Sequence, residues 1–183
     1  MRDKQISRKA VFSLVGLIGL LALIFGGGGH LGLFSKVHLE VIERGPYTIV
    51  GLSYKGPYRK IVHRLKTVNA ELEASGLANT VKMQCAILYD APKDVDPKSQ
   101  QSLVGFIVKN DDLVGEPAKY TIERIATRKV VVAKIEAHPS VALFRSYPKI
   151  KRWAKKNNYD FSVPMLEIYH RNGLVELEVP ITR

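Results

Sequence analysis

The sequence predicts an α+β fold of two βαββ repeats, related by a pseudo-two-fold axis with a central cleft and preceded by one transmembrane helix. The tripeptide Ile-Glu-Arg occurs at 42–44 and again at 122–124, and each time it opens an apolar run that ends at a proline. A helix-like stretch and two more apolar runs follow in both copies. An uncharged segment near the start of the chain predicts the membrane helix.

The N-terminal segment divides into a basic tail, residues 1–10, and an apolar anchor, residues 11–34. About 20 residues at a rise of about 1.5 Å each cross the hydrocarbon core of a bilayer, so the anchor is long enough for a single pass. A cleaved secretory signal is the alternative, because it also has a basic stretch before an apolar one. The Lys and Arg before the segment slightly favour a cytoplasmic N-terminus, and the side of the membrane on which the domain lies stays open.

The first repeat spans about 37–110 of a domain that covers 37–183. From Ile61 to Leu72, apolar residues recur at intervals of four, three and four positions, which places them on one face of a helix that Gly76 ends. Alternating residues over 81–89 then predict a strand. A second strand over 103–108 completes this repeat.

The second repeat spans about 119–183 and has the same order of elements. A helical turn over 141–147 is followed by a new helix that begins at Pro148, because proline is favoured at the first helical position. Two strands follow, over 163–169 and 174–179, and the Asn-Gly dipeptide between them is typical of a tight β-hairpin.

The chain is basic, with a formal net charge of +11. Residues 1–36 hold five Lys or Arg and one Asp, hence +4, which leaves +7 for the domain. Such a surface favours anionic partners, including lipid headgroups. A solvated helix face is the alternative interpretation of its densest cluster. The predicted lipid- or anion-binding residues are Lys149, Lys151, Arg152, Lys155 and Lys156.

The sequence predicts no metal site and no cofactor. Its five His residues have no spacing to Cys or to carboxylates that is typical of metal ligands. The single cysteine, Cys85, excludes a disulfide within the chain.

Glu167 is the most informative polar residue. Strand alternation places it on one face with Met165 and Tyr169, inside an otherwise apolar run. Alignment of the two copies makes Ile87 the counterpart of Glu167, and Tyr89 the counterpart of Tyr169. An ionised carboxylate buried there costs several kcal/mol unless it is paired or its pKa rises. We therefore predict a ligand site in a cleft, with an exposed surface position for Glu167 as the alternative. The predicted ligand-binding residues are Glu167, Tyr169, Tyr89, Ile87, Met165 and Tyr54.

Two motifs support a family resemblance, Leu88-Tyr89-Asp90-Ala91-Pro92 and the segment from Pro164 to Tyr169. With the repeated strand-helix-strand-strand plan, they resemble the GyrI-like small-molecule-binding superfamily, which includes effector domains of multidrug-responsive transcription regulators. The resemblance implies that Glu167 and Tyr169 contact a ligand in the central cleft. Together with the predicted anchor, the second motif is similar to the membrane-anchored testis-expressed endoplasmic-reticulum-phagy receptor group.

These inferences predict a membrane-anchored GyrI-like domain that binds a hydrophobic, cationic small molecule or a peptide, as a sensor or adaptor without catalysis. Two alternatives stay open. One is a hydrolase of small electrophilic compounds that uses Glu167 and a cleft tyrosine. The other is a lipid- or protein-binding membrane adaptor with a vestigial cleft. Nucleic acid is not a predicted partner, because the anchor occupies the place where a DNA-reading element would precede the domain.

Overall fold

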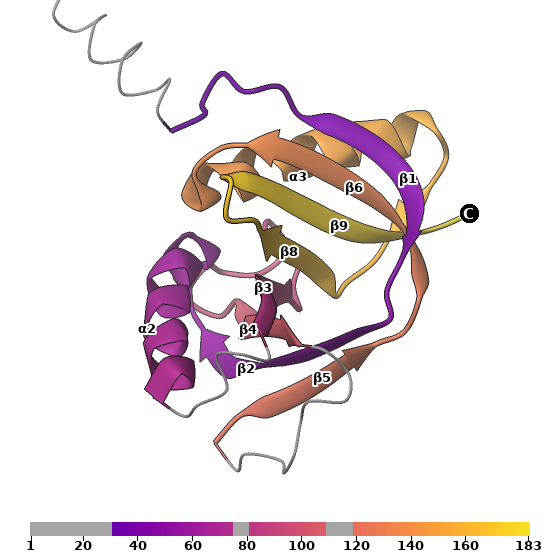
Figure 1. The fold of residues 1–183 in the computed structure, drawn as a ribbon. Helices are drawn as coiled ribbons and strands as arrows, with labels where there is room; N and C mark the ends of the chain where they lie inside the picture. Colours follow the sequence, from indigo (N-terminus) through magenta and orange to yellow (C-terminus); the bar gives the residue numbers. More distant parts are fainter. Residues whose placement is uncertain (1–30, 75–80, 109–118) are drawn as a thin grey trace, which may run out of the picture.

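A computed structural model of the protein describes residues 31–74, 81–108 and 119–183 (Figure 1). The elements in chain order are β1 (His38–Arg44), β2 (Tyr47–Lys55), the 3-10 turn η1 (Tyr58–Lys60), α2 (Ile61–Ala74), β3 (Val81–Leu88), β4 (Gln101–Val108), β5 (Thr121–Ile125), β6 (Arg128–Glu136), α3 (Pro139–Lys156), β7 (Asp160–Phe161), β8 (Met165–Tyr169) and β9 (Leu174–Thr182).

The strands form one antiparallel sheet in the order β1-β6-β9-β8-β3-β4-β2-β5, with β7 paired to β9. The order is symmetric, since β1-β6-β9-β8 from one edge corresponds to β5-β2-β4-β3 from the other. β3 and β8 are neighbours at the centre of the sheet. β1 continues almost directly into β2, and β5 into β6, so these long strands connect the two halves of the sheet (Figure 1). The structure is therefore α+β, whereas the sequence repeat itself stays a prediction.

Two sequence predictions about individual elements are wrong. The first Ile-Glu-Arg tripeptide lies in β1 and the second lies in β5. Each half therefore has two strands before its helix, whereas the repeated pattern predicts one. α3 also runs through Pro148 as one helix and begins at Pro139, with the side chain of His138 accepting a hydrogen bond from the Ser140 N–H. Proline removes one backbone hydrogen bond in a helix, and the buried neighbours Tyr147 and Ile150 hold both halves of α3 on the sheet.

Both helices pack on one face of the sheet, and the larger core cluster lies there. Ala86 and Leu88 of β3 belong to that cluster, together with residues of α2, α3, β8 and β9. Their neighbours Cys85 and Ile87 belong to a second cluster on the opposite face, which also includes Leu166 and Ile168. This separation follows from the strict alternation of side chains along a strand.

A polar cluster on that opposite face holds the bend between β1 and β2 against β9. Glu178 is fully buried and accepts a hydrogen bond from the Tyr47 hydroxyl at 2.9 Å. Arg44 lies between two carboxylates, with its Nε 3.4 Å from Glu178 and an Nη 3.0 Å from Glu176. Burial raises the pKa of Glu178 despite these partners. The cluster links residues about 130 positions apart and so ties the bend between β1 and β2 to β9.

The predicted membrane anchor falls mostly outside the described residues. Its last four positions, 31–34, form a turn. Within the described part of the chain, we find no helix with the length and apolar character needed to span a bilayer.

We expect Gly105→Ala to lower the free energy of unfolding. Gly105 lies opposite Gly51 in the β2–β4 ladder, and a Cβ at Gly105 would overlap the carbonyl oxygen of Val50. Overpacking of this kind typically costs about 1–3 kcal/mol. Denaturant titration of the full chain measures the loss. Gly173→Asn is the matched control, because this hairpin glycine has nothing within 4 Å and its φ of +83° is one that asparagine tolerates. An equal loss in both variants would contradict the role of close strand approach.

Candidate ligand-binding site

A cavity of about 510 Å³ opens over the central strands between the first turns of α3 and the η1–α2 segment. β8 contributes its floor, η1 and α2 contribute one wall, and α3 contributes the other. The lining residues are Tyr58, Arg59, Val62, Pro92, Lys93, Pro139, Ser140, Leu143, Phe144, Tyr147, Pro148, Glu167 and Tyr169.

Glu167 lies at the floor of this cavity. It is 3% exposed, and the β-ladders pair it with Ala86 on one side and Leu177 on the other, so its strand neighbours are apolar. The Tyr169 hydroxyl donates a hydrogen bond to Glu167 Oε2 at 2.7 Å. Among the described residues, Glu167 Oε1 has no hydrogen-bond partner. One oxygen of this buried acid is therefore unpaired among the described residues, at the floor of the cavity.

Burial raises the pKa of Glu167 to about 7, although the hydrogen bond from Tyr169 acts in the opposite direction. Removal from water disfavours the charged form of a carboxyl group. The pKa of Tyr169 is well above its ordinary value, through burial and the neighbouring carboxylate, so its hydroxyl keeps its proton and acts as the donor. Near neutral pH, Glu167 is thus divided between its acid and its carboxylate forms.

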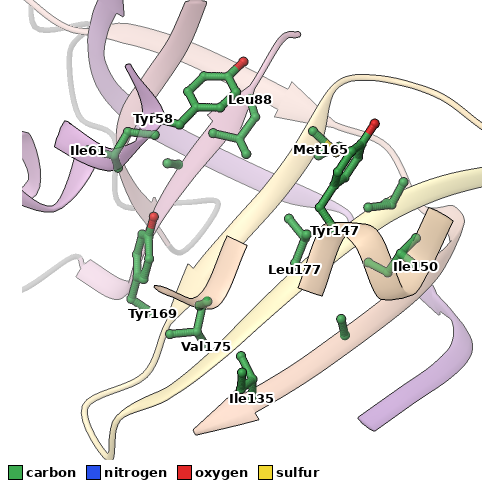
Figure 2. Packing of buried hydrophobic residues seen from close by; sticks show 14 of the residues in the cluster. Tyr58, Ile61, Leu88, Ile135, Tyr147, Ile150, Met165, Tyr169, Val175 and Leu177 are labelled. Atoms are coloured by element: carbon green, nitrogen blue, oxygen red, sulfur yellow. The ribbon is translucent and has the colours of Figure 1, made fainter. Parts of the chain in front are cut away.

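Two further tyrosines form the walls, and Figure 2 shows that Tyr58, Tyr147 and Tyr169 come from three separate elements. Tyr58 is fixed in place, because its hydroxyl accepts a hydrogen bond from the Asp90 N–H at 3.0 Å, and its own N–H donates to Gln100 Oε1 at 3.1 Å. Tyr147 packs edge-on against Phe161 with 5.9 Å between ring centroids. At the rim, Phe144 is 80% exposed and offers an apolar surface to whatever enters.

The charges around the cavity are separated by depth. Arg59 and Lys93 are exposed at its rim, whereas Glu167 is buried at its floor. Among the described lining residues, Glu167 is the only acid. An apolar body that carries a positive charge would therefore match both the walls and the floor.

The structure brings together only part of the predicted ligand-binding set. Glu167 and Tyr169 line the cavity. Met165 shares their face but is fully buried in the core beneath it. Tyr54 also packs against that core, where the Arg64 guanidinium lies 5.5 Å from its ring centroid, and it does not line the cavity.

Ile87 and Tyr89 lie on the opposite face of the sheet, packed in the second cluster. The predicted equivalence of Ile87 with Glu167 is wrong, because Ile87 packs with Leu166 in the second cluster, on the face of the sheet opposite to Glu167. An offset of one residue moves a side chain to the other face of a sheet. Sequence reasoning in turn missed Tyr58, Phe144 and Tyr147. The aromatic spacing of 144 and 147 on one helix was the available signal.

The predicted basic cluster lies on the exposed side of α3, while Ile150 and Ala154 face the core as expected. Cys85 is buried, and burial raises the pKa of its thiol. The described residues contain no group of three or more His, Cys, Asp or Glu side chains arranged to hold a metal ion.

All five residues of the predicted basic cluster on α3 are exposed: Lys149, Lys151, Arg152, Lys155 and Lys156.

An apolar cavity with a buried acid at its floor, framed by two helices on a curved antiparallel sheet, defines a domain built to enclose a small molecule. Residues 38–181 match the family of GyrI-like small molecule binding domains, and the chain belongs to this family.

Solved structures share the fold at low sequence identity. SAV2435 bound to tetraphenylphosphonium is 13% identical, with a TM-score of 0.57, and the match covers 79% of this chain and 94% of that one. An EcmrR–DNA complex is 13% identical, with a TM-score of 0.61 and coverage of 100% and 74%. A hydrolase from Listeria innocua is 10% identical, with a TM-score of 0.52 and coverage of 79% and 91%. At these identities the likeness shows the fold alone.

No curated protein matches the chain in sequence. The family match and the solved structures identify the GyrI-like domain, and they do not distinguish the membrane-anchored receptor group.

We expect the unfolding free energy of the protein to fall as pH rises from about 4.5 to about 7. In this window the unfolded chain ionises Glu167 while the folded chain retains the proton, because the folded pKa is the higher one. The loss amounts to roughly 3 kcal/mol, at about 1.4 kcal/mol per pH unit. Denaturant titrations at several pH values, with Glu167→Gln alongside, measure it.

Glu167→Gln should lack this part of the pH dependence, since it has no proton to retain. Titration of Glu178 is common to both proteins and cancels in the comparison. Parallel curves for wild type and variant would show that Glu167 is not the buried acid that titrates in this range.

Proposed function

We propose that the protein binds hydrophobic cations in the cavity above β8, with Glu167 as the counter-charge. The observation that carries this proposal is the free Oε1 of Glu167 at the buried floor of an apolar cavity. A cation placed there would supply the partner that the described residues do not, and would stabilise the ionised carboxylate in surroundings that otherwise disfavour it.

The walls support the same class of ligand. Tyrosine faces attract cations, and apolar side chains such as Leu143 and Val62 accommodate a hydrophobic body. A volume of about 510 Å³ lies within the range of roughly 300–1,000 Å³ that is usual for small-molecule pockets. A protein of similar fold has been solved with tetraphenylphosphonium, a cation of this type. A peptide with an exposed cationic side chain and an apolar neighbour would meet the same chemistry.

We also propose that residues 11–34 tether this domain to a membrane, so that it acts there as a sensor or adaptor. The support is the uncharged length of the segment. The narrower kinship with the membrane-anchored receptor group rests on the same segment and on the motif 164–169.

We expect tetraphenylphosphonium to bind the wild-type chain and Glu167→Gln to bind it at least about tenfold more weakly, a difference of about 1.4 kcal/mol. Affinity should also increase as pH rises through about 7 in the wild type, because only the carboxylate attracts the cation, and this dependence should vanish in the variant. Isothermal titration calorimetry of the full chain in a non-ionic detergent, corrected for partition into micelles, measures both.

Tyr169→Phe and Tyr89→Phe form a matched pair, since each removes one hydroxyl. The first should change affinity because Tyr169 holds Glu167 in place, and the second should not because Tyr89 lies on the other face. Weakened binding in Tyr89→Phe alone, or equal affinity of wild type and Glu167→Gln, would place the ligand elsewhere.

A hydrolase is the second candidate function, favoured by the same carboxyl group. A pKa of about 7 suits a general base, and Tyr169 can stabilise developing negative charge beside it. Turnover of a strained-ring electrophile such as an epoxide should then rise through pH 7 and disappear in Glu167→Gln. Absence of turnover in a protein that binds tetraphenylphosphonium would leave binding as the function.

A further inference from the structure

A second cavity, also of about 510 Å³, lies between α3 and the segment that leads into β1. It uses a different stripe of α3 from the ligand site, formed by Arg145, Lys149 and Arg152 at positions i, i+4 and i+7. Lys36 and His38 contribute from the opposite side. The remaining lining residues are Phe34, Ser35 and Val37.

All the ionised side chains that line this second cavity, those of Lys36, Arg145, Lys149 and Arg152, are cationic. Arg145 donates a hydrogen bond to the Ser35 carbonyl at 3.1 Å, and Lys149 donates to the Val37 carbonyl at 2.5 Å, so neutral backbone oxygens hold these two side chains in position. Within the described part of the chain, none of the four Lys and Arg side chains forms an ion pair with a carboxylate. Their positive charge is therefore available to an anion.

Apolar side chains lie directly beside this charge. Leu31, Leu33 and Phe34 are 42%, 39% and 60% exposed, an unusual concentration for four consecutive positions. The His138 N–H donates a hydrogen bond to the Leu31 carbonyl at 3.1 Å, which fixes this turn against the start of α3. Upstream of it, the sequence contains no ionised residue back to Ala10.

We propose that the second cavity binds the phosphate group of an anionic lipid at a bilayer surface, with Leu31, Leu33 and Phe34 contacting the apolar layer beside it. A cationic hollow next to exposed apolar side chains matches the two chemistries of a headgroup and its acyl chains. A free phosphate ion would use only the charge. The site shares Lys149 and Arg152 with the basic cluster predicted from sequence, whereas Lys151, Lys155 and Lys156 lie outside it.

The test is calorimetric titration of the full chain, in a non-ionic detergent, with dihexanoyl phosphatidic acid, dihexanoyl phosphatidylcholine and inorganic phosphate. Phosphatidic acid should bind, and the other two should bind at least about tenfold more weakly. Lys36→Gln/Arg152→Gln removes two exposed cations from the cavity without touching the backbone hydrogen bonds. Since each Lys or Arg near an anionic surface contributes about fivefold to affinity, this variant should lose at least about tenfold.

Lys155→Gln/Lys156→Gln is the control, with the same change of charge on the same helix outside the cavity. It should lose less than about twofold, and both variants should retain tetraphenylphosphonium binding if the wild type has it. Equal losses in the two variants would overturn the site in favour of general attraction to a basic surface. Equal binding of inorganic phosphate would assign it to a small anion, and equal binding of phosphatidylcholine or no binding at all would also refute the proposal.

Discussion

The pairing of β3 with β8 is the constraint on which the rest of the structure depends. These two strands come from different halves of the chain and form the centre of the sheet. Their register decides that Glu167 and Tyr169 face the helices, while Ile87 and Leu166 face away. A slip by one residue would exchange the two sets and place the acid in the wrong layer. Both core clusters and the candidate site are thus fixed by a single ladder.

Around this ladder, two long strand pairs connect the halves of the sheet and two helices form the walls of the cavity. β1–β2 and β5–β6 connect the halves of the sheet, and Arg44, Tyr47 and Glu178 hold the bend of the first pair. The walls rest on different strands, α2 mainly on β4 and α3 mainly on β6 and β9, and the two helices also contact each other. Both walls and the floor of the cavity therefore share one core cluster, which includes residues of α2, α3, β8 and β9.

Local patterns were sufficient for much of the fold, and the limits of prediction are specific. Alternation along one strand identified Glu167 and Tyr169, because a carboxylate in an apolar run is visible in the sequence alone. Ile87 and Tyr89 were misplaced because the register between strands depends on pairing partners about 80 residues apart, which no local pattern encodes. Tyr58 is held at the site by hydrogen bonds to distant residues, among them Asp90 and Gln100, which no local pattern reveals. Pro148 suggested a boundary that tertiary packing of α3 overrides.

Only one of the two carboxyl oxygens of Glu167 has a hydrogen-bond partner among the described residues, and the protonation of this group affects the net charge of the domain. Below neutrality the empty cavity holds a proton on this acid, and a bound cation would displace it. Occupation is then an exchange of one positive charge for another, and the net charge of the protein is the same before and after. Such an exchange is electroneutral, so neither an electrical potential nor the basic surface of the domain would oppose the entry of a cation. The proton concentration of the compartment would instead set how readily the site is filled.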